Sequence, residues 1–351
     1  MNKPMGLMVL LLGALLVLGA CGDDGNDEDG DPTNNATNND TNNDTPNNDT
    51  NNDGNNDVNN DDPGACAACS EEQICVADAC QDAVIPEPGG NVNTAADGDC
   101  GASTFAYVSG FVVDQFNRPV PGAKAQACVE TVNAGLLCLM PADTDDNGGF
   151  EVILPDNARC STDFAMRVLL PGDDKVTQYC HTELEDETVV KLTEGIFLYD
   201  TTRGTDAGGD DNTARAVTFA DGLEIEVTPA TLFDPVTDRL AAVALDADSP
   251  GLCFLEGQPT PDAVYGLSPE TDILNDAYPI KVPNTKGLAP GTTVDFFVLG
   301  GLDCTLANGD KVGEAEWRQY GTGVVDGAGE FINSNEDGHL PCINWFGYKA
   351  R

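Results

Sequence analysis

Two stretches decide the fold of this chain: "SGFVVDQFNRPVPGAKAQA" at residues 109–127 and "TDDNGGFEVILP" at residues 144–155. Each joins a short run of β-branched and aromatic residues to a cluster of Pro, Gly, Asn and Asp. Such clusters are typical of tight turns, and the runs beside them have the composition of strands. Pro121-Gly122 predicts a turn after a first strand, and residues 145–149 predict a hairpin before Phe150 enters the core.

The same alternation of short runs and turns extends over residues 104–200. Seven β-prone runs follow one another with turn clusters between them, and no helical pattern interrupts the series. Short strands at regular spacing predict a β-sandwich.

This first region resembles the carboxypeptidase-regulatory-like domain, a transthyretin-type sandwich. The residues that carry the resemblance are Ser109, Gly110, Val112, Asp114, Pro119, Pro121, Gly122, Ala123, Thr144, Asp145, Gly148 and Phe150. The resemblance implies an Ig-like or transthyretin-like β-sandwich of the kind that accompanies peptidases. The catalytic half that would go with it is absent from this sequence.

A linker at residues 201–213 leads to a second β region at residues 214–351. Alternating strands on either side of Asp221-Gly222 predict a hairpin. The region resembles the paired β-sandwich modules of netrin receptors and ankyrins. The shared elements are this strand pair, Pro283-Asn284-Thr285, Gly287-Leu288, Pro290-Gly291, the Trp317 strand, Gly321-Thr322-Gly323 and the closing Gly338 to Trp345. The resemblance implies a second β-sandwich, although residues 238–276 have no counterpart in those modules.

Three aromatic residues of this second region can be interpreted either as a binding surface or as part of the core. Trp317, Trp345 and Phe346 would form a sugar-stacking platform if their rings were exposed. Aromatic residues on strands belong to the core more often, so the core interpretation is favoured.

The N-terminus predicts an anchor. Residues 1–20 have a basic start at Lys3, an apolar run too short to span a bilayer, and small residues at the end. Leu18-Gly19-Ala20-Cys21 resembles the lipoprotein box of bacterial lipoproteins. The resemblance implies cleavage before Cys21, lipid on its thiol and acylation of the new amino group. The alternative is an ordinary secreted protein with a stray Cys beside its cleavage site.

Residues 21–64 predict a disordered acidic linker. Past Cys21 the segment repeats Thr, Asn and Asp, contains no Lys or Arg, and has too few apolar side chains to offset the entropy of ordering. Next come four cysteines within residues 65–82, Cys66, Cys69, Cys75 and Cys80. Their spacing favours a small two-disulfide knot over a zinc site. A connector at residues 83–103 leads to the first sandwich.

The charge excludes one class of partner. Lys and Arg total 16 against 60 Asp and Glu, which gives a net charge of −44. No basic surface is available to contact nucleic-acid phosphates. Electrostatic adsorption to anionic lipid is equally disfavoured, so we expect the membrane to be a partner only through lipid on Cys21.

The remaining cysteines indicate an oxidising compartment. Of 13 cysteines, Cys21 is assigned to lipid, and the other twelve form an even set. Five lie between residues 100 and 180 and three lie in the C-terminal region, so at least one disulfide should join the two sandwiches. We expect Cys128–Cys138 and Cys160–Cys180 to be local, and Cys100 to pair with a C-terminal cysteine.

One stretch has part of the sequence pattern of a calcium-binding loop. "DTDDNG" at residues 143–148 has the beginning of an EF-hand loop, with Asp143, Asp145 and Asn147 in ligand positions. Leu154 stands where the bidentate Glu should be, and a strand is predicted to follow. A hairpin turn is therefore favoured, with weak calcium binding left open and no other cofactor indicated.

No catalytic motif is present: the sequence lacks a His-Glu-x-x-His, a Gly-x-Ser-x-Gly, a phosphate loop and a dinucleotide Gly motif. We expect a non-enzymatic envelope lipoprotein that displays its β-sandwiches for protein binding, adhesion or envelope assembly. Gly22 after Cys21 resembles the signal for export to the outer membrane. The alternative is a module that binds carbohydrate or peptidoglycan, and a hydrolase with unrecognised carboxylates is a third, less favoured class.

Overall fold

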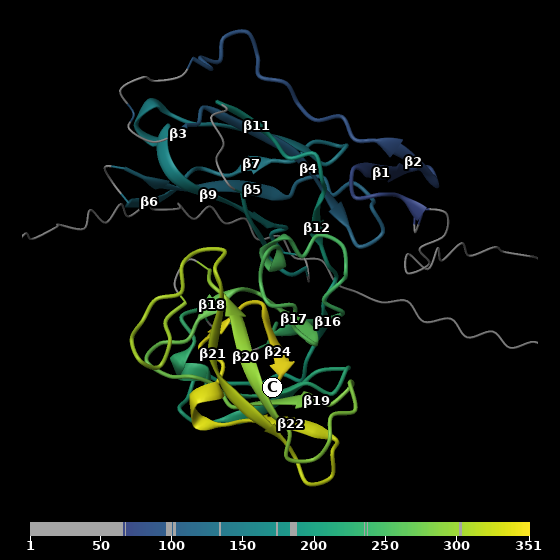
Figure 1. The fold of residues 1–351 in the computed structure, drawn as a ribbon, viewed down its shortest axis with the longest axis vertical. Helices are drawn as coiled ribbons and strands as arrows, with labels where there is room; N and C mark the ends of the chain where they lie inside the picture. Colours follow the sequence, from purple (N-terminus) through teal and green to yellow (C-terminus); the bar gives the residue numbers. More distant parts are fainter. Residues whose placement is uncertain are drawn as a thin grey trace, which may run out of the picture. The chain divides into compact units, whose positions relative to one another are not determined.

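The computed structural model describes residues 66, 68–95, 100, 103–132, 135–172, 175–182, 188–234, 236, 238–301 and 304–351. The predicted signal peptide, Cys21 and the acidic linker lie outside these residues. The described chain is built from strands and from short 3-10 turns, η2 (Asp156–Ala158), η3 (Pro229–Thr231), η4 (Cys253–Leu255) and η5 (Glu336–Gly338) (Figure 1). The predicted all-β fold is therefore confirmed. Within the described part of the chain, no helix is long and apolar enough to cross a bilayer.

The small cysteine-rich module is a two-stranded hairpin. Strands β1 (Gln73–Val76) and β2 (Ala79–Asp82) pair antiparallel across a turn in which Ala77 and Asp78 both have positive φ. That backbone twist suits a tight hairpin. The disulfides Cys66–Cys75 and Cys69–Cys80 close the module on itself, as the cysteine spacing predicted.

The hairpin is docked on the first sandwich. The side-chain Nδ2 of Asn117 donates to the carbonyls of Ser70 (2.8 Å) and Gln73 (3.1 Å), and the Cys75 amide donates to the Asn117 carbonyl at 2.7 Å. Ile74 is buried against residues of the sandwich. The module is therefore part of the folded body.

The first sandwich has two sheets. Its strands are β3 (Ser103–Thr104), β4 (Tyr107–Asp114), β5 (Lys124–Thr131), β6 (Gly135–Cys138), β7 (Ala142–Asp143), β8 (Gly149–Ile153), β9 (Cys160–Leu169), β10 (Gln178–His181), β11 (Val189–Lys191) and β12 (Ile196–Leu198). One sheet has the order β10-β9-β5-β6, with β3 on β9 and β7 on β5. In the other, β4 is flanked by β11 and β12 and also pairs with β8. Both β11 and β12 run parallel to β4.

The core of this sandwich comes from the alternation seen in the sequence. Phe150, Val152, Phe164, Met166 and Val168 are buried between the sheets, together with Val108 and Val112 of β4. Because side chains alternate between the faces of a strand, each run places every second residue in this core.

The second domain is built on one long antiparallel sheet. Its strands are β13 (Thr202–Arg203), β14 (Arg215–Thr218), β15 (Glu224–Val227), β16 (Ala241–Leu245), β17 (Ala263–Ser268), β18 (Thr271–Asp272), β19 (Ile280–Pro283), β20 (Thr293–Leu299), β21 (Trp317–Val325), β22 (Phe331–Ser334), β23 (Cys342–Ile343) and β24 (Phe346–Ala350). The ten-stranded sheet has the order β13-β16-β17-β24-β20-β21-β22-β19-β15-β14, and β18 pairs separately with β23.

This sheet folds over onto itself. Val217 and Ile225, from one end of the strand order, share a core with Tyr265 and Phe346 from the other half. Beyond β13, the Thr205 amide donates to the carbonyl of Thr218 in β14, so the two edges of the sheet are linked. The expected second β-sandwich is present, built from a folded-over sheet.

The disulfides partly confirm the predicted pairing. Cys128–Cys138 is local, and one bridge, Cys180–Cys253, joins the two sandwiches. The predicted Cys160–Cys180 pair and the C-terminal partner for Cys100 are wrong, because Cys100 pairs with Cys160. Strand β3 runs beside the start of β9 and brings Cys100 there, whereas Cys180 lies on the edge strand β10. The sixth bridge is Cys304–Cys342.

A third hydrophobic core belongs to both sandwiches. Residues 59–351 form one compact unit, and the buried residues of this core come from both halves of it. We call it the inter-sandwich core. Its members from the cysteine-rich hairpin and first sandwich are Ile74, Phe111, Val113, Ala165, Val176, Tyr179, Phe197 and Tyr199, and those from the second are Leu252, Phe254, Val264, Phe297, Leu299, Ala315, Trp317 and Trp345.

Trp345 lies in the inter-sandwich core with no exposed surface. Its Nε1 donates to the carbonyl of Thr177 in the first sandwich at 2.8 Å, and its ring contacts Tyr199 edge-on. In the second sandwich Gly266 makes room for this ring, because a Cβ there would lie 2.9 Å from it. A buried indole that is also hydrogen-bonded satisfies both its apolar and its polar requirements. Trp345 therefore fixes the second sandwich against the first.

Trp345→Ala should lower the free energy of unfolding by about 3–5 kcal/mol, because it opens a cavity in a buried aromatic contact. Chemical denaturation measures this change. Phe233→Ala is the matched control, since Phe233 is 67% exposed, and it should change stability by less than about 0.5 kcal/mol. Equal losses in the two variants would contradict the role given to Trp345.

Candidate binding cleft

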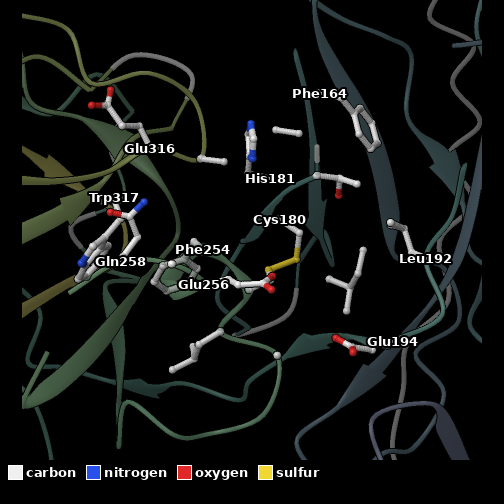
Figure 2. Close-up of a pocket in the computed structure, with 18 of the residues that line it drawn as sticks. Phe164, Cys180, His181, Leu192, Glu194, Phe254, Glu256, Gln258, Glu316 and Trp317 are labelled. Carbon is white, nitrogen blue, oxygen red and sulfur yellow. A yellow bond between two sulfur atoms is a disulfide. The ribbon is translucent and has the colours of Figure 1, made fainter. Parts of the chain in front are cut away.

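A cleft of about 1220 Å³ lies between the two sandwiches. The first sandwich contributes the end of β10 and the segment from β11 to β12, and the second contributes η4 with its flanking loop and the start of β21. The Cys180–Cys253 disulfide crosses the cleft region, with Glu194, Glu256, Glu316 and His181 around it (Figure 2). The cleft is therefore a product of the joining of the two domains.

The lining of the cleft is strongly acidic. Its carboxylates are Glu71, Glu130, Glu194, Asp248, Glu256, Glu314 and Glu316. Against these seven, the lining includes one basic side chain, Lys191, which is paired with Glu87 at 2.5 Å, and one histidine, His181. All the carboxylates except that of Glu314 belong to exposed residues. A concave surface of one sign concentrates the field and attracts counter-charges.

The acidic groups of the cleft affect one another. Partial burial raises the pKa of Glu71, and the negative charge of Glu194 raises it further. This mutual repulsion would be relieved by a positive charge between the two groups.

A more buried ionic cluster lies beside the cleft. Arg167 of β9 forms an ion pair with Glu270 of the second sandwich, with Nη2 2.8 Å from Oε2. Arg167 also donates from Nε to the hydroxyl oxygen of Tyr179 at 3.0 Å, and the Tyr179 hydroxyl donates to Glu270. Burial and then the charge of Glu270 raise the pKa of Tyr179 well above its ordinary value. These contacts cross between the sandwiches and reinforce the inter-sandwich core.

Glu314 stands close to this pair without joining it. Burial raises the pKa of Glu314 to about 7, and repulsion from Glu270 contributes, while Arg167 acts in the opposite direction. The Sγ atoms of Cys128 and Cys138 lie within 4.8 Å of a Glu314 oxygen, an arrangement that would suit a metal if the sulfurs were thiolates. They are bonded to each other, so this group is not a metal site.

The three aromatic residues considered for sugar stacking are buried. Trp345 and Phe346 have no exposed surface and Trp317 is 6% exposed. Trp317 and Trp345 belong to the inter-sandwich core, and Phe346 belongs to the core of the second sandwich. The stacking-platform interpretation is therefore wrong, because these rings hold the cores together, and the core interpretation is correct.

The residues considered for calcium form the predicted hairpin turn between β7 and β8. The Asp145 carboxylate accepts hydrogen bonds from the amides of Asn147 and Gly149, each at 2.8 Å. Asp143 is ion-paired with Lys124. Two of the three side chains therefore have structural partners, and calcium binding there stays a prediction.

The sequence did not indicate the residues of the ionic cluster between the two sandwiches. Arg167, Glu270 and Glu314 lie far apart in the chain, and no motif distinguishes two acidic residues among 60. His181 is an exposed residue that lines the cleft, and no sequence motif includes it. Only the odd number of cysteines in each sandwich indicated that the two sandwiches are in contact. Cys21 lies outside the described residues.

No family model matches the chain, and no curated protein matches it. Solved structures give weak matches. The 3-chlorocatechol 1,2-dioxygenase of Rhodococcus opacus is 15% identical over 32% of this chain and 65% of its own, slightly less than two thirds, with a TM-score of 0.20. The major pilin BcpA of Bacillus cereus is 11% identical, and the match covers 67% of this chain and 85% of BcpA, with a TM-score of 0.19. The major pilin SpaD of Corynebacterium diphtheriae is also 11% identical, and the match covers 70% of this chain and 85% of SpaD, with a TM-score of 0.22. Similarity at this level assigns neither a family nor a function.

Proposed function

We propose that this protein is a non-enzymatic, lipid-anchored protein of the bacterial cell envelope that binds a partner protein through the cleft between its sandwiches. The observation that carries the proposal is the cleft itself, about 1220 Å³ and lined by seven carboxylates. Lipid on Cys21 would hold the chain at the membrane, in keeping with the lipoprotein-box resemblance, and the acidic linker would separate the folded body from it.

The chemistry of the cleft defines the partner. Exposed carboxylates on both walls favour a segment rich in Lys or Arg, whose charges would pair with groups from both sandwiches. The walls are held by the Cys180–Cys253 disulfide and the inter-sandwich core, so little ordering entropy would be lost when the partner binds. The carbohydrate alternative loses its main support, because the aromatic residues that suggested it are buried.

Deca-lysine should bind the chain with an affinity that falls steeply as salt increases. Replacing three cleft residues together, Glu194→Gln, Glu256→Gln and Glu316→Gln, should weaken binding about 10-fold in calorimetric titrations at low salt, since each exposed charge contributes about 0.5 kcal/mol.

The matched control removes the same charge outside the cleft: Asp146→Asn, Asp276→Asn and Glu336→Gln, all at exposed positions that do not line the cleft. This variant should bind deca-lysine within about 2-fold of the unmodified chain. Equal weakening by the two triple variants would mean that the overall charge, and not the cleft, attracts the peptide.

The proposed anchor has its own test. Replacing Cys21 with Ala removes the only thiol that the lipoprotein box offers for lipid, so the chain should leave the detergent phase in a phase-partitioning experiment. Cys304→Ala, which removes a disulfide cysteine instead, is expected to leave partitioning unchanged. Retention of the Cys21→Ala chain in the detergent phase would exclude lipid on this residue as the anchor.

A further inference from the structure

Glu314 is a carboxyl group held between the sandwiches without a balancing charge of its own. It lies in the loop before β21, lines the cleft, and its Oε1 is buried with no hydrogen-bond partner among the described residues. The group is half-buried, unlike the exposed carboxylates around it. An ionised carboxylate in such a place loses hydration that nothing replaces.

The nearby cation is already engaged. Arg167 pairs with Glu270 at 2.8 Å and also contacts the Tyr179 hydroxyl, so its guanidinium and the Glu270 carboxylate balance each other. Ionised Glu314 would add a second negative charge beside this balanced pair. The cluster formed by Arg167, Tyr179, Glu270 and Glu314 is therefore neutral only when Glu314 carries a proton.

The contact that Glu314 makes with the first sandwich also requires a proton. Its Oε2 lies 3.4 Å from Sγ of Cys138, which is bonded to Cys128. A disulfide sulfur has no hydrogen to donate and is only a weak acceptor. The contact can be a hydrogen bond only when the Glu314 carboxyl is protonated and donates. The raised pKa of Glu314, about 7 and caused first by burial, agrees with this geometry.

We propose that Glu314 is a proton-dependent latch between the two sandwiches. With its proton, it closes the contact between the loop before β21 and the Cys128–Cys138 disulfide. When it ionises, this contact is lost and the inter-sandwich contact loosens at the cleft. The latch needs no ligand, so it stands independently of the proposed partner.

The sign of the pH dependence follows from linkage. In the loosened state Glu314 is hydrated and takes its ordinary pKa, near 4.5, while in the closed state the pKa is about 7. Below the lower value both states carry the proton, so pH has no effect through this group. Between the two values the closed state binds more protons, so raising the pH favours loosening. Above pH 7 the effect is complete.

Other charged groups face the same region. Glu270 and Arg167 act on Glu314 from the two sandwiches, Glu316 lies two residues along its loop, and Glu130 and His181 line the cleft from the first sandwich. Of these, Glu316 and His181 are ionisable neighbours that line the cleft and can be replaced one at a time. Both therefore serve as controls.

The two tryptophans report the inter-sandwich contact directly. Both lie in the inter-sandwich core, and the Trp345 Nε1–H is bonded across it to Thr177. In the full chain, NMR measures the exchange rate of the indole Nε1–H between pH 4 and pH 8. The intrinsic exchange rate at each pH, divided by the measured rate, gives a protection factor. We expect that factor for Trp345 to fall between pH 4.5 and 7 by up to about 300-fold, and then to level off.

Glu314→Gln should remove this fall, because its amide cannot ionise, while Glu316→Gln and His181→Gln should retain it. A fall that persists in Glu314→Gln, or vanishes in either control, would overturn the proposal. If Glu314→Gln fails to fold, the carboxyl ¹³C titration of Glu314 in the unmodified chain decides: a midpoint near 7 supports the latch, and a midpoint near 4.5 overturns it.

Discussion

The structure depends on the contact that Trp345 makes across the boundary between the two sandwiches. The indole fills the inter-sandwich core, its Nε1–H is bonded to Thr177, and Gly266 leaves the space that the ring needs. The Cys180–Cys253 disulfide and the Arg167–Glu270 pair act at the same boundary. Because apolar, covalent and ionic contacts coincide there, the two domains and the cleft between them form one body.

The local structure was largely predictable from the sequence. The turn at residues 145–149, the hairpin around Asp221-Gly222 and the alternation along β4, β8 and β14 to β15 all follow from short-range rules. The odd number of cysteines in each sandwich, five and three, also required at least one bridge between them, and Cys180–Cys253 is that bridge. These inferences succeed because the conformations that turn residues favour, and the number of cysteines in each sandwich, do not depend on how the domains finally pack.

The candidate site was not predictable in the same way. Arg167, Glu270 and Glu314 meet only because β9 of one sandwich packs against loops of the other, and that docking leaves no local pattern. The same limit explains the error over Cys100, whose partner depends on how β3 lies against β9. The aromatic residues were ambiguous from sequence, since a strand aromatic looks the same whether its ring faces solvent or a second domain.

The central claim is that the two sandwiches move as one body. Backbone ¹⁵N relaxation of the chain from residue 65 onward tests it directly, by comparing amides of β5 in the first sandwich with amides of β21 in the second. The account predicts that a single rotational diffusion tensor fits both sets. Two different tensors, with the shorter correlation times expected of separate domains, would contradict it.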